Sequence, residues 1–490
     1  GEPDASSFPS GGLRATFEAR GYTTWDITSP AFIKETATGP TLCIPTAFCS
    51  YTGEVLDKKT PLLRSMERIN TEAVKILHLL GKENVTRVTT TVGPEQEYFL
   101  IDRDAYDQRE DLIYTGRTLF GAAPVKGQEL EDHYFGVIKQ RVSDYMKDLD
   151  KHLWALGVSS KTKHNEVAPA QHECAPIFES ANLAADHNQL MMEMMKKVAL
   201  EHDMVCLLHE KPFAGVNGSG KHDNWALSTD DGQNLLNPGD SPMENAQFLT
   251  FLVAIIKAVD EYADLLRLSV ATAGNDHRLG ANEAPPAIIS IFLGEELNDV
   301  INALVAGTNV EAKHAQFDIG VTSLPKFPKD TTDRNRTSPF AFTGNKFEFR
   351  SVGSSLNISG PNIVLNTIVA EELEQFADEL EKADDFKKAL KELLVKTIKE
   401  HSRVIFNGNG YDAAWVKEAT EVRGLPELKS TVDALPHFLD EKNIKVFTKH
   451  KVFSEVEMHS RTEILLENYS KTINIEALTT AEMAKKEILP

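Results

Sequence analysis

The segment Arg87–Ile101, which contains the string GPEQEYFL, constrains the fold more than any other part of the sequence. It is rich in Thr, Val, Tyr and Phe and alternates before a charged turn, a pattern typical of a strand with one buried face. Glu95 and Glu97 stand two positions apart in it, so the period of a strand sends both carboxylates to the same side of a sheet. Two like charges held together favour a bound cation. The alternative is a solvated strand face, but the flanking Val92 and Tyr98 favour a core strand.

A second acidic segment, KHNEVAPAQHE, supplies His164, Glu166, His172 and Glu173 within ten residues. Pro169 forces a bend between them, which can bring the carboxylates of Glu166 and Glu173 toward one point. Carboxylate oxygens suit Mg²⁺ or Mn²⁺ better than Zn²⁺. A surface loop with incidental charge is the alternative interpretation, and the presence of another acidic pair on a separate strand argues against it.

The glycine-rich string NGSGKHDN, from Asn217 to Asn224, predicts a turn whose backbone can approach a phosphate or carboxylate closely. His222 could add a nitrogen ligand for a metal. Read from Gly215, the string GVNGSGK also matches a phosphate-binding P-loop. However, His222 stands where that loop needs a Ser or Thr hydroxyl, and the string NWALSTDDG that follows is typical of a strand and turn. The pattern therefore argues against a P-loop.

Cationic side chains cluster further along the chain, in the strings NDHRLGANEAPP, DRNRT and NKFEFR. Several arginines held together are costly unless anions arrive, and planar guanidinium groups match carboxylate and phosphate in bidentate fashion. Any one of them could instead be a surface salt-bridge partner. Glu348 and Arg350 stand two apart on a predicted strand and so share a face. Together with the acidic segments, the set predicts an enzyme that brings together metal, phosphate and carboxylate. Its cationic members are Arg278, Arg334, Arg336, Lys346 and Arg350.

Apolar spacing predicts helices and short strands without a regular βαβ repeat, and hence a mixed α+β fold. Residues 1–50, which are rich in Pro and Gly, predict loops and short strands, and the chain beyond residue 400 predicts amphipathic helices. The expected helices cover 61–80, 134–156, 183–202, 244–270 and 360–404. The expected strands cover 87–101, 160–168, 204–210, 287–293 and 346–351.

The composition limits the class of protein. A chain of 490 residues, 41% of them hydrophobic, can bury a sizeable core and is expected to form two or three structural units. Its 73 acidic and 52 basic side chains give a net charge of -21, which argues against nucleic acid or an anionic membrane as the main partner. No stretch approaches about 20 uninterrupted apolar residues, so we expect a soluble protein. Four cysteines without CxxC spacing predict free thiols in a reducing, cytoplasmic compartment. Because the sequence starts at Gly1, we expect it to begin inside a longer polypeptide.

Seven of these segments, taken in order, resemble the glutamine synthetase family, and most of all its large type III branch. They are DASSFPSGG, GPEQEYFL, NEVAPAQHE, NGSGKH, HRLGANEAP, NRT and KFEFR. The resemblance implies the later part of a β-grasp domain over 1–55 and a catalytic domain of curved antiparallel strands backed by helices over 56–405. An insertion over about 294–330 and a helical C-terminal extension over 406–490 complete the expected division. A homo-oligomer is also implied, with two stacked hexameric rings and active sites between neighbouring subunits.

The resemblance implies metal ligands residue by residue, for two to three Mg²⁺ or Mn²⁺ ions in each active site. The ligands of the ion that orients the γ-carboxylate of glutamate would be Glu97, Glu166 and Glu173. The ligands of the ion on the nucleotide phosphates would be Glu95, His222 and Glu348.

Other positions resemble residues that bind the substrates. Arg278 resembles the arginine that holds the glutamate carboxylate, and Asn217 and Gly218 resemble the loop that touches the amino-acid backbone. Arg350 is implied in substrate binding as well. Residues implied to bind ATP are Asn224, Arg336 and Lys346.

Four positions resemble catalytic residues of the family. Arg336 and Arg350 would stabilise the transferred phosphoryl group. Glu283 resembles a flap glutamate that closes the site and takes a proton from the amine. Asp4 resembles an aspartate that binds ammonium across the subunit interface.

The implied activity is ATP-dependent ligation of ammonia to L-glutamate, giving L-glutamine, ADP and phosphate through γ-glutamyl phosphate. A carboxylate is a poor electrophile, so phosphorylation supplies its leaving group, and divalent ions with cationic side chains neutralise the moving phosphoryl group. Two alternatives remain: ligation of another amine to glutamate, for which Asp4 is the argument against, and a catalytically silent structural homologue. The complete set of metal-ligand positions argues against the second.

Overall fold

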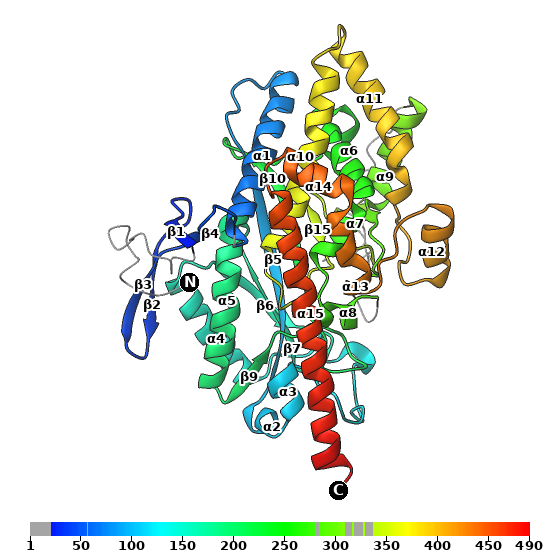
Figure 1. The fold of residues 1–490 in the computed structure, drawn as a ribbon. Helices are drawn as coiled ribbons and strands as arrows, with labels where there is room; N and C mark the ends of the chain where they lie inside the picture. The colour runs from blue at the N-terminus through cyan, green and yellow to red at the C-terminus, as the bar shows by residue number, and fades with distance from the viewer. Residues whose placement is uncertain (1–20, 56, 281–283, 309–315, 318–326, 329–336) are drawn as a thin grey trace.

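The structure is a computed structural model, and it describes residues 21–55, 57–280, 284–308, 316–317, 327–328 and 337–490. Helices cover a central sheet, and a long helix runs to the C-terminus (Figure 1). The expected class of mixed helix and antiparallel-rich sheet with helices at the C-terminal end is confirmed. Among the described helices, none combines the length and the apolar character needed to cross a lipid bilayer.

The central sheet is built around β5 (Val88–Asp102), the strand expected from the alternation in that segment. β5 pairs with β10 on one side and with β7 on the other, and β8 and β9 pair with further parts of it. The ladder pairs in this sheet are antiparallel except for β11 with β14. In spatial order its strands are β11 (Ile291–Phe292), β14 (Phe340–Phe342), β15 (Phe347–Phe349), β10 (Lys221–Thr229), β5, β7 (Gln171–Pro176) and β6 (Ser160–Asn165), with β8 (Glu179–Ser180) and β9 (Met204–Leu207) beside β5.

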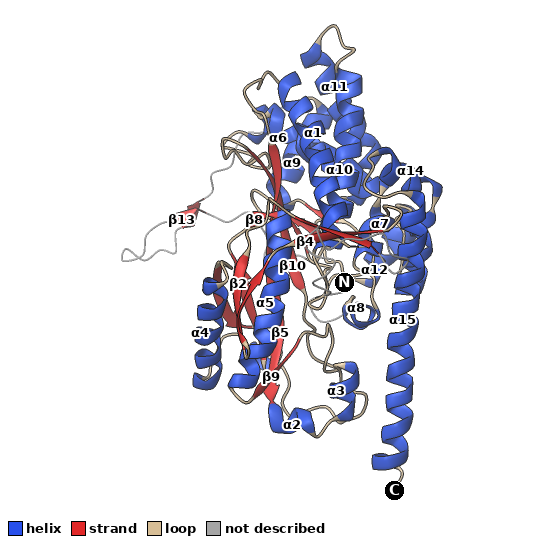
Figure 2. Ribbon diagram, turned by 60° about the vertical axis from the view of Figure 1, so that its left-hand side comes forward, coloured by secondary structure: helices blue, strands red, loops and turns tan. Residues whose placement is uncertain are grey.

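Alternation along β5 divides the sheet into an apolar face and a polar face. Val88 and Val92 belong to the larger apolar cluster of the protein, and Tyr98 and Leu100 belong to a second one. These even-numbered side chains pack in clusters with residues of the helices that cover the sheet. Figure 2 shows these helices beside the strands. Burying each such side chain stabilises the fold by about 1.5–3 kcal/mol, so the register of β5 is strongly specified. Its odd-numbered side chains therefore face the other way. The covering helices are α1 (Lys59–Leu79), α4 (Gln140–Ala155), α5 (Ala181–Glu201), α6 (Ala246–Glu261) and α10 (Ser359–Leu380).

Three expected helices differ from the structure in their bounds. The prediction of one helix over 244–270 is wrong in its continuity, because α6 ends before Tyr262 and α7 (Ala263–Ser269) follows. The helix expected over 360–404 is likewise two, α10 and α11 (Phe386–His401), and the Asp385 side chain caps α11 by accepting from the Lys388 amide at 3.1 Å. The helix expected from residue 134 begins at 140. Apolar periodicity indicates which face of each helix is buried, but it does not indicate where one helix ends and the next begins.

The N-terminal described residues form two small antiparallel sheets, as short strands were expected there. β1 (Gly21–Trp25) pairs with β4 (Thr46–Ser50), and β2 (Phe32–Thr36) pairs with β3 (Gly39–Cys43). The remaining elements are α2 (Arg103–Asp107), α3 (Glu110–Thr115), α8 (Ala273–Arg278), α9 (Gly294–Ala306), β12 (Gln316–Phe317), β13 (Phe327–Pro328), α12 (Ala413–Lys417), α13 (Thr431–Ala434), α14 (Glu441–Lys449) and α15 (Glu455–Met483). All four cysteines are free thiols, as expected.

Candidate active site

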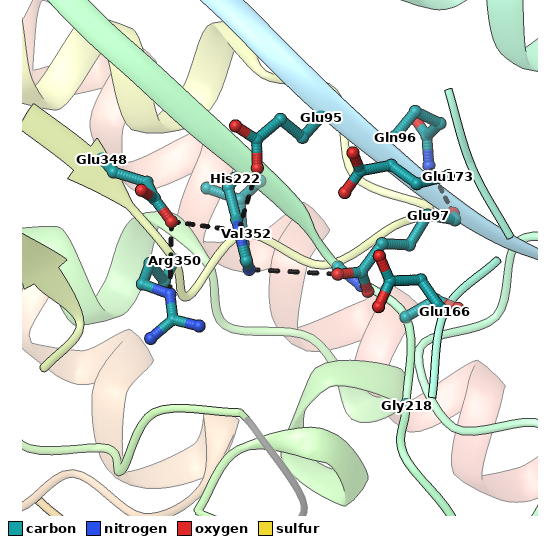
Figure 3. A network of polar contacts seen from close by, with 12 residues as sticks. Glu95, Gln96, Glu97, Glu166, Glu173, Gly218, His222, Glu348, Arg350 and Val352 are labelled. Carbon is teal, nitrogen blue, oxygen red and sulfur yellow. Dashed lines mark hydrogen bonds and ion pairs between the residues drawn. The ribbon is translucent and has the colours of Figure 1, made fainter. Parts of the chain in front are cut away.

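Polar side chains line the face of the central sheet that is turned away from the covering helices (Figure 3). β5 contributes Glu95 and Glu97 to this face through strand alternation. The antiparallel register places His222 of β10 opposite Glu95 and Glu173 of β7 opposite Glu97. One strand further, Glu348 of β15 lies opposite Asn224 of β10. Ordinary strand pairing thus gathers residues that lie far apart in the sequence.

The first cluster consists of Glu95, His222 and Glu348, one from each of three adjacent strands. Nδ1 of His222 lies 3.2 Å from Oε2 of Glu95 and 3.1 Å from Oε1 of Glu348. Burial lowers the pKa of His222, but its hydrogen bonds to Glu348 and Glu95 outweigh this effect and raise the pKa to about 10. The imidazole is therefore protonated at neutral pH and occupies a position between two carboxylates that favours positive charge.

The second cluster consists of His164, Glu166 and Glu173, from β6, the β6–β7 turn and β7. Nε2 of His164 lies 2.8 Å from Oε1 of Glu166, and its Nδ1 lies 3.9 Å from Oε1 of Glu173. The turn folds back sharply, with Ala170 at φ 64° and the Glu166 amide donating to the carbonyl of Gln171 at 2.9 Å. The sequence predicted this bend, and it brings the two carboxylates together.

Glu97 lies between the two clusters. Its Oε1 is 4.0 Å from Nε2 of His222, and its Oε2 accepts a hydrogen bond from the Gly220 amide at 2.6 Å. Figure 3 shows Glu97, Glu166 and Glu173 turned toward one another. Burial, followed by the charge of Glu166, raises the pKa of Glu97 to about 7, although His222 and the Gly220 amide act in the opposite direction.

The charge balance of this face favours cations. Burial, followed by the charges of Glu95 and Glu166, holds the pKa of Glu173 well above its usual range. Raised pKa values of buried neighbouring carboxylates mean that their negative charges are incompletely neutralised by the protein. Carboxylate oxygens with imidazole nitrogen form a donor set suited to Mg²⁺ or Mn²⁺. The residues present therefore fit divalent cations at two adjoining positions.

Two arginines border the clusters. Nε of Arg350 lies 3.3 Å from Oε1 of Glu348. Arg278 is buried, and its guanidinium donates to the carbonyl oxygen of Arg350 at 3.1 Å and to that of Val352 at 3.4 Å. Burial lowers the pKa of Arg278, which Glu97 partly offsets, but a guanidinium stays cationic in proteins. Because neutral carbonyls hold its position, the charge of Arg278 remains suited to attract an anionic ligand.

Glycines allow the loop before β10 to approach Arg278. A Cβ added at Gly220 would lie 2.6 Å from Cζ of Arg278, and one at Gly218 would lie 3.1 Å from its Cγ. A larger residue at either position would displace the guanidinium or the loop. The loop leads into strand β10 rather than into a helix, so the argument against a P-loop is confirmed.

Two residues at the site were not predicted from the sequence. The Gln128 side chain donates to Oδ1 of Asn217 at 2.9 Å and accepts from the Asn217 amide at 2.7 Å. Nδ1 of His133 lies 2.6 Å from the carbonyl oxygen of Glu166. Both belong to the segment 117–139, which joins α3 to α4 with little regular structure. That segment has no helical or strand periodicity, so the sequence does not indicate which of its side chains face the site. The structure places it against Asn217 and the second cluster.

Two of the residues expected to bind the nucleotide lie in the described part of the chain. Asn224 lies next to the first cluster, and Lys346 lies in an adjoining turn. The Asn224 amide donates to Oε1 of Glu95 at 2.8 Å and to the carbonyl of Gly93 at 3.1 Å. Lys346 lies in the turn between β14 and β15, where its carbonyl accepts from the Thr343 amide at 2.9 Å. Asp4, Glu283, Arg334 and Arg336 lie outside the described residues.

Two other groups of acidic residues and histidine already contain a cation. Glu371, Glu374 and His450 surround Lys449, whose Nζ lies 2.7 Å from Glu371 and 2.9 Å from Glu374. The group of Asp264, His437 and Asp440 includes a 2.9 Å ion pair from Lys442 to Asp264. These pairs connect α14 to α10 and α7 and supply positive charge from lysine side chains.

Models of known protein families match three parts of the chain. The model described as glutamine synthetase type III N terminal matches residues 1–65, and glutamine synthetase, catalytic domain matches residues 73–288. The glutamine synthetase C-terminal domain matches residues 389–490. The catalytic-domain match contains the residues of the site up to Arg278, whereas Glu348 and Arg350 lie beyond its end.

Similar proteins share these names. The chain is 57% identical over 494 residues to the type-3 glutamine synthetase of Dictyostelium discoideum, covering 100% of this chain and 67% of that protein. It is 56% identical over 471 residues to a glutamine synthetase of Butyrivibrio fibrisolvens, covering 96% of this chain and 66% of that protein. The chain thus spans about two thirds of their length. The cryo-electron microscopy structure of Plasmodium falciparum glutamine synthetase is similar in fold, with a TM-score of 0.60, 14% identity, and coverage of 96% of this chain and 87% of that one.

Proposed function

The chain belongs to the glutamine synthetase family, in its type III branch, and we propose that it ligates ammonia to L-glutamate with ATP. The products are L-glutamine, ADP and phosphate, and the intermediate is γ-glutamyl phosphate. The match to the catalytic domain and two relatives named glutamine synthetase support the enzyme class. Because the chain spans about two thirds of those relatives, the activity of the whole protein is part of this proposal.

One observation carries the proposal: two clusters of carboxylates and imidazoles adjoin each other on one sheet face, with Arg278 and Arg350 at their border. The raised pKa values of Glu97 and Glu173 indicate a deficit of positive charge in the middle of this face. A reaction that joins a triphosphate to a carboxylate needs this combination of cation-binding acids and anion-binding arginines.

The donor sets fit two to three Mg²⁺ or Mn²⁺ ions as cofactors. When bound, these ions supply positive charge to the phosphates and to the γ-carboxylate of glutamate. One position would be held by Glu97, Glu166 and Glu173. The other would be held by Glu95, His222 and Glu348.

The cationic side chains orient the two anionic substrates. Arg278, held by backbone carbonyls, binds the α-carboxylate of glutamate, and Asn217 with Gly218 contacts its backbone. Arg350 stabilises the phosphoryl group as it moves to the γ-carboxylate, together with Arg336. Lys346, Asn224 and Arg336 contact ATP.

The ammonia half of the reaction is assigned from the family resemblance. Asp4 binds ammonium, because a carboxylate favours NH₄⁺ over neutral competitors. Glu283 closes over the site and accepts a proton from the amine, so that ammonia can displace phosphate from the acyl group. Closure also excludes water, which would otherwise hydrolyse the acyl phosphate.

The assembly and the domain division belong to the same proposal. The active protein is a homo-oligomer of two stacked hexameric rings in the cytoplasm, with glutamate, ammonium and ATP as its small-molecule partners. Its parts are the β-grasp portion over 1–55, the catalytic domain over 56–405 with the insertion near 294–330, and the extension over 406–490.

An assay of the intact protein with glutamate, ATP and ammonium tests the function. Phosphate release and glutamine should both depend on ammonium and on Mg²⁺ or Mn²⁺, titrated separately. Glu97→Ala should abolish metal-dependent activity, whereas Glu283→Ala should retain ATP binding and lose mainly amide formation. Glu467→Ala, at an exposed residue paired with Lys471 on α15, is the matched control and should behave as wild type.

The same assay separates the alternatives. Ethanolamine and a polyamine replace ammonium in parallel reactions. Phosphate release with one of these amines but not with ammonium would refute glutamine synthesis in favour of another γ-glutamyl amide. A protein that binds Mn²⁺ but releases no phosphate with any amine would be a silent homologue.

A further inference from the structure

The C-terminal helix α15 contacts the rest of the protein at two separate places. At its start, Glu457 accepts a hydrogen bond from the Val55 amide at 2.7 Å and completes a capping box with Ser454. Between Thr462 and Glu476 no residue of the helix is buried. At Glu476 burial resumes, where α15 passes α8 and reaches α3 (Figure 1). The second contact is therefore separate from the first and is held by different residues.

The second contact is a bidentate ion pair. Nε of Arg117 donates to Oε1 of Glu476 at 2.9 Å, and its Nη2 donates to Oε2 at 2.6 Å. The Glu476 side chain is 9% exposed and that of Arg117 is 22% exposed. Burial acts to raise the pKa of Glu476, but the hydrogen bonds and charge of Arg117 outweigh it, so the pKa is lowered. A parallel pair of charge-assisted hydrogen bonds at such low exposure fixes both position and orientation.

Two histidines adjoin this ion pair. Nε2 of His277 lies 4.0 Å from Oε2 of Glu476. His209 lies beside Gly116 and Gly274, where an added Cβ would be 3.4 Å from its Cβ and 3.5 Å from its Nε2, respectively. Burial lowers the pKa of His209, and the charges of Glu210, Arg117, His277 and Glu476 act on it as well. Glu476 is thus a carboxylate among three basic side chains that come from three different segments.

Each of these segments carries, holds or leads to a residue with a proposed part in glutamate binding. Arg117 begins the segment 117–139, which holds Asn217 through Gln128. His277 is followed directly by Arg278 in the short helix α8. His209 precedes the loop that leads to Asn217. Segment 117–139 also reaches the second cluster, where His133 lies against the carbonyl oxygen of Glu166 and Tyr134 against the ring of His164.

We propose that Glu476 is a positioning residue for glutamate: by holding Arg117 beside α8, it sets the segment 117–139 and Arg278 in the geometry that binds the amino acid. This inference rests on the proposed function. Without the carboxylate, Arg117 would be left partly buried beside two histidines and would turn toward solvent. Glutamate would then have to order the segment on binding, which weakens its affinity and leaves the nucleotide side unaffected.

Glu476→Gln in the full chain tests the proposal, with Glu467→Gln on the exposed face of the same helix as the control. We expect the KM for glutamate to rise about 10-fold in Glu476→Gln, the size of effect that losing hydrogen bonds to a charged group produces. The KM for ATP should stay within about 2-fold. Glu476→Asp should raise the KM for glutamate less than Glu476→Gln does, because it keeps the carboxylate charge on a shorter side chain.

Hydrogen exchange of the resting protein supplies a readout that needs no turnover. Amides of 117–139 should exchange faster in Glu476→Gln than in Glu467→Gln, and the swapped pair Arg117→Glu with Glu476→Arg should restore slow exchange. Equal exchange in the two single variants, or KM values for glutamate and ATP that rise together, would overturn the proposal. A wild type that forms no glutamine refutes the proposed function instead, and the exchange comparison then decides whether Glu476 holds the segment.

Discussion

Replacing Glu97 with Gln should stabilise the metal-free protein above neutral pH while removing a proposed metal ligand. Glu97 is buried, its neighbours include Glu166, and its pKa is raised to about 7 from an ordinary value of 4.5. Gln has the same shape, and its amide oxygen can still accept the hydrogen bond from the Gly220 amide. The substitution therefore removes a destabilising charge and keeps the packing.

The magnitude follows from the difference between the two pKa values. A rise from 4.5 to about 7 means that ionising Glu97 in the folded protein costs about 3 kcal/mol more than in the unfolded chain. Below pH 4.5 the carboxyl is neutral in both states, so its contribution is fully retained there. As the pH rises from 4.5 through about 7, the unfolded chain ionises first and the folded protein loses that stability. Glu97→Gln has no such loss.

Thermal unfolding in a chelating buffer, followed across pH 5 to 8, measures this effect. At pH 8 the melting temperature of Glu97→Gln should exceed that of the wild type by about 2 to 4 °C, and the gap should close toward pH 5. Glu467→Gln, at an exposed ion pair, should follow the wild type at every pH. Added Mn²⁺ should reverse the order, because it stabilises the wild type by binding and binds the variant less tightly.

A metal-free Glu97→Gln variant that melts below the wild type at pH 8 would refute the reasoning. That result would mean that the carboxylate is already neutralised by His222 and Arg278 and contributes to stability without a metal. An increase that is the same at pH 5 and pH 8 would show that the effect arises from packing and not from charge.

Three further predictions concern the borders of the clusters. Mn²⁺ binding to the metal-free protein should release protons at pH 7, because His222 has a pKa of about 10 and must lose its proton to bind a metal, and calorimetric heats that do not depend on the buffer would contradict this. Arg278→Lys should raise the KM for glutamate about 10-fold or more and leave that for ATP within about 2-fold, since a lysine cannot bind a carboxylate in bidentate fashion. Gly220→Ala should have the same selective effect, because its Cβ would lie 2.6 Å from Cζ of Arg278, and an unchanged KM for glutamate would count against that geometry.

Local periodicity was sufficient to predict the centre of the fold. Alternation in Arg87–Ile101 predicted β5 and the shared face of Glu95 and Glu97, because a strand of period two with apolar residues on one side has one favourable register. The bend between Glu166 and Glu173 followed from a single proline. Both features depend on a few neighbouring residues, which is why the sequence alone sufficed.

Contacts across the fold could not be predicted in the same way. The residues around Glu476 come from α15, α8 and the segment after α3, and they show no common pattern in the sequence. Gln128 lies in a segment without periodicity, where neither helix nor strand spacing indicates which side chains face the site. The break at Tyr262 was missed for a related reason, because both α6 and α7 are buried apolar helices and continuous apolar spacing does not reveal where one helix ends and the next begins.

The two faces of the central sheet make opposite contributions to stability, and this opposition connects the fold to the proposed chemistry. Val88 and Val92 are buried in the apolar cluster that they share with α1, α5, α6 and α10, and this burial holds β5 in register. That same register places Glu97 opposite Glu173 on the other face, where burial and neighbouring carboxylates raise the pKa of both. A sheet with less apolar burial behind it would relax by turning these carboxylates outward into water. The helices behind the sheet therefore preserve an acidic site that we expect bound cations to stabilise.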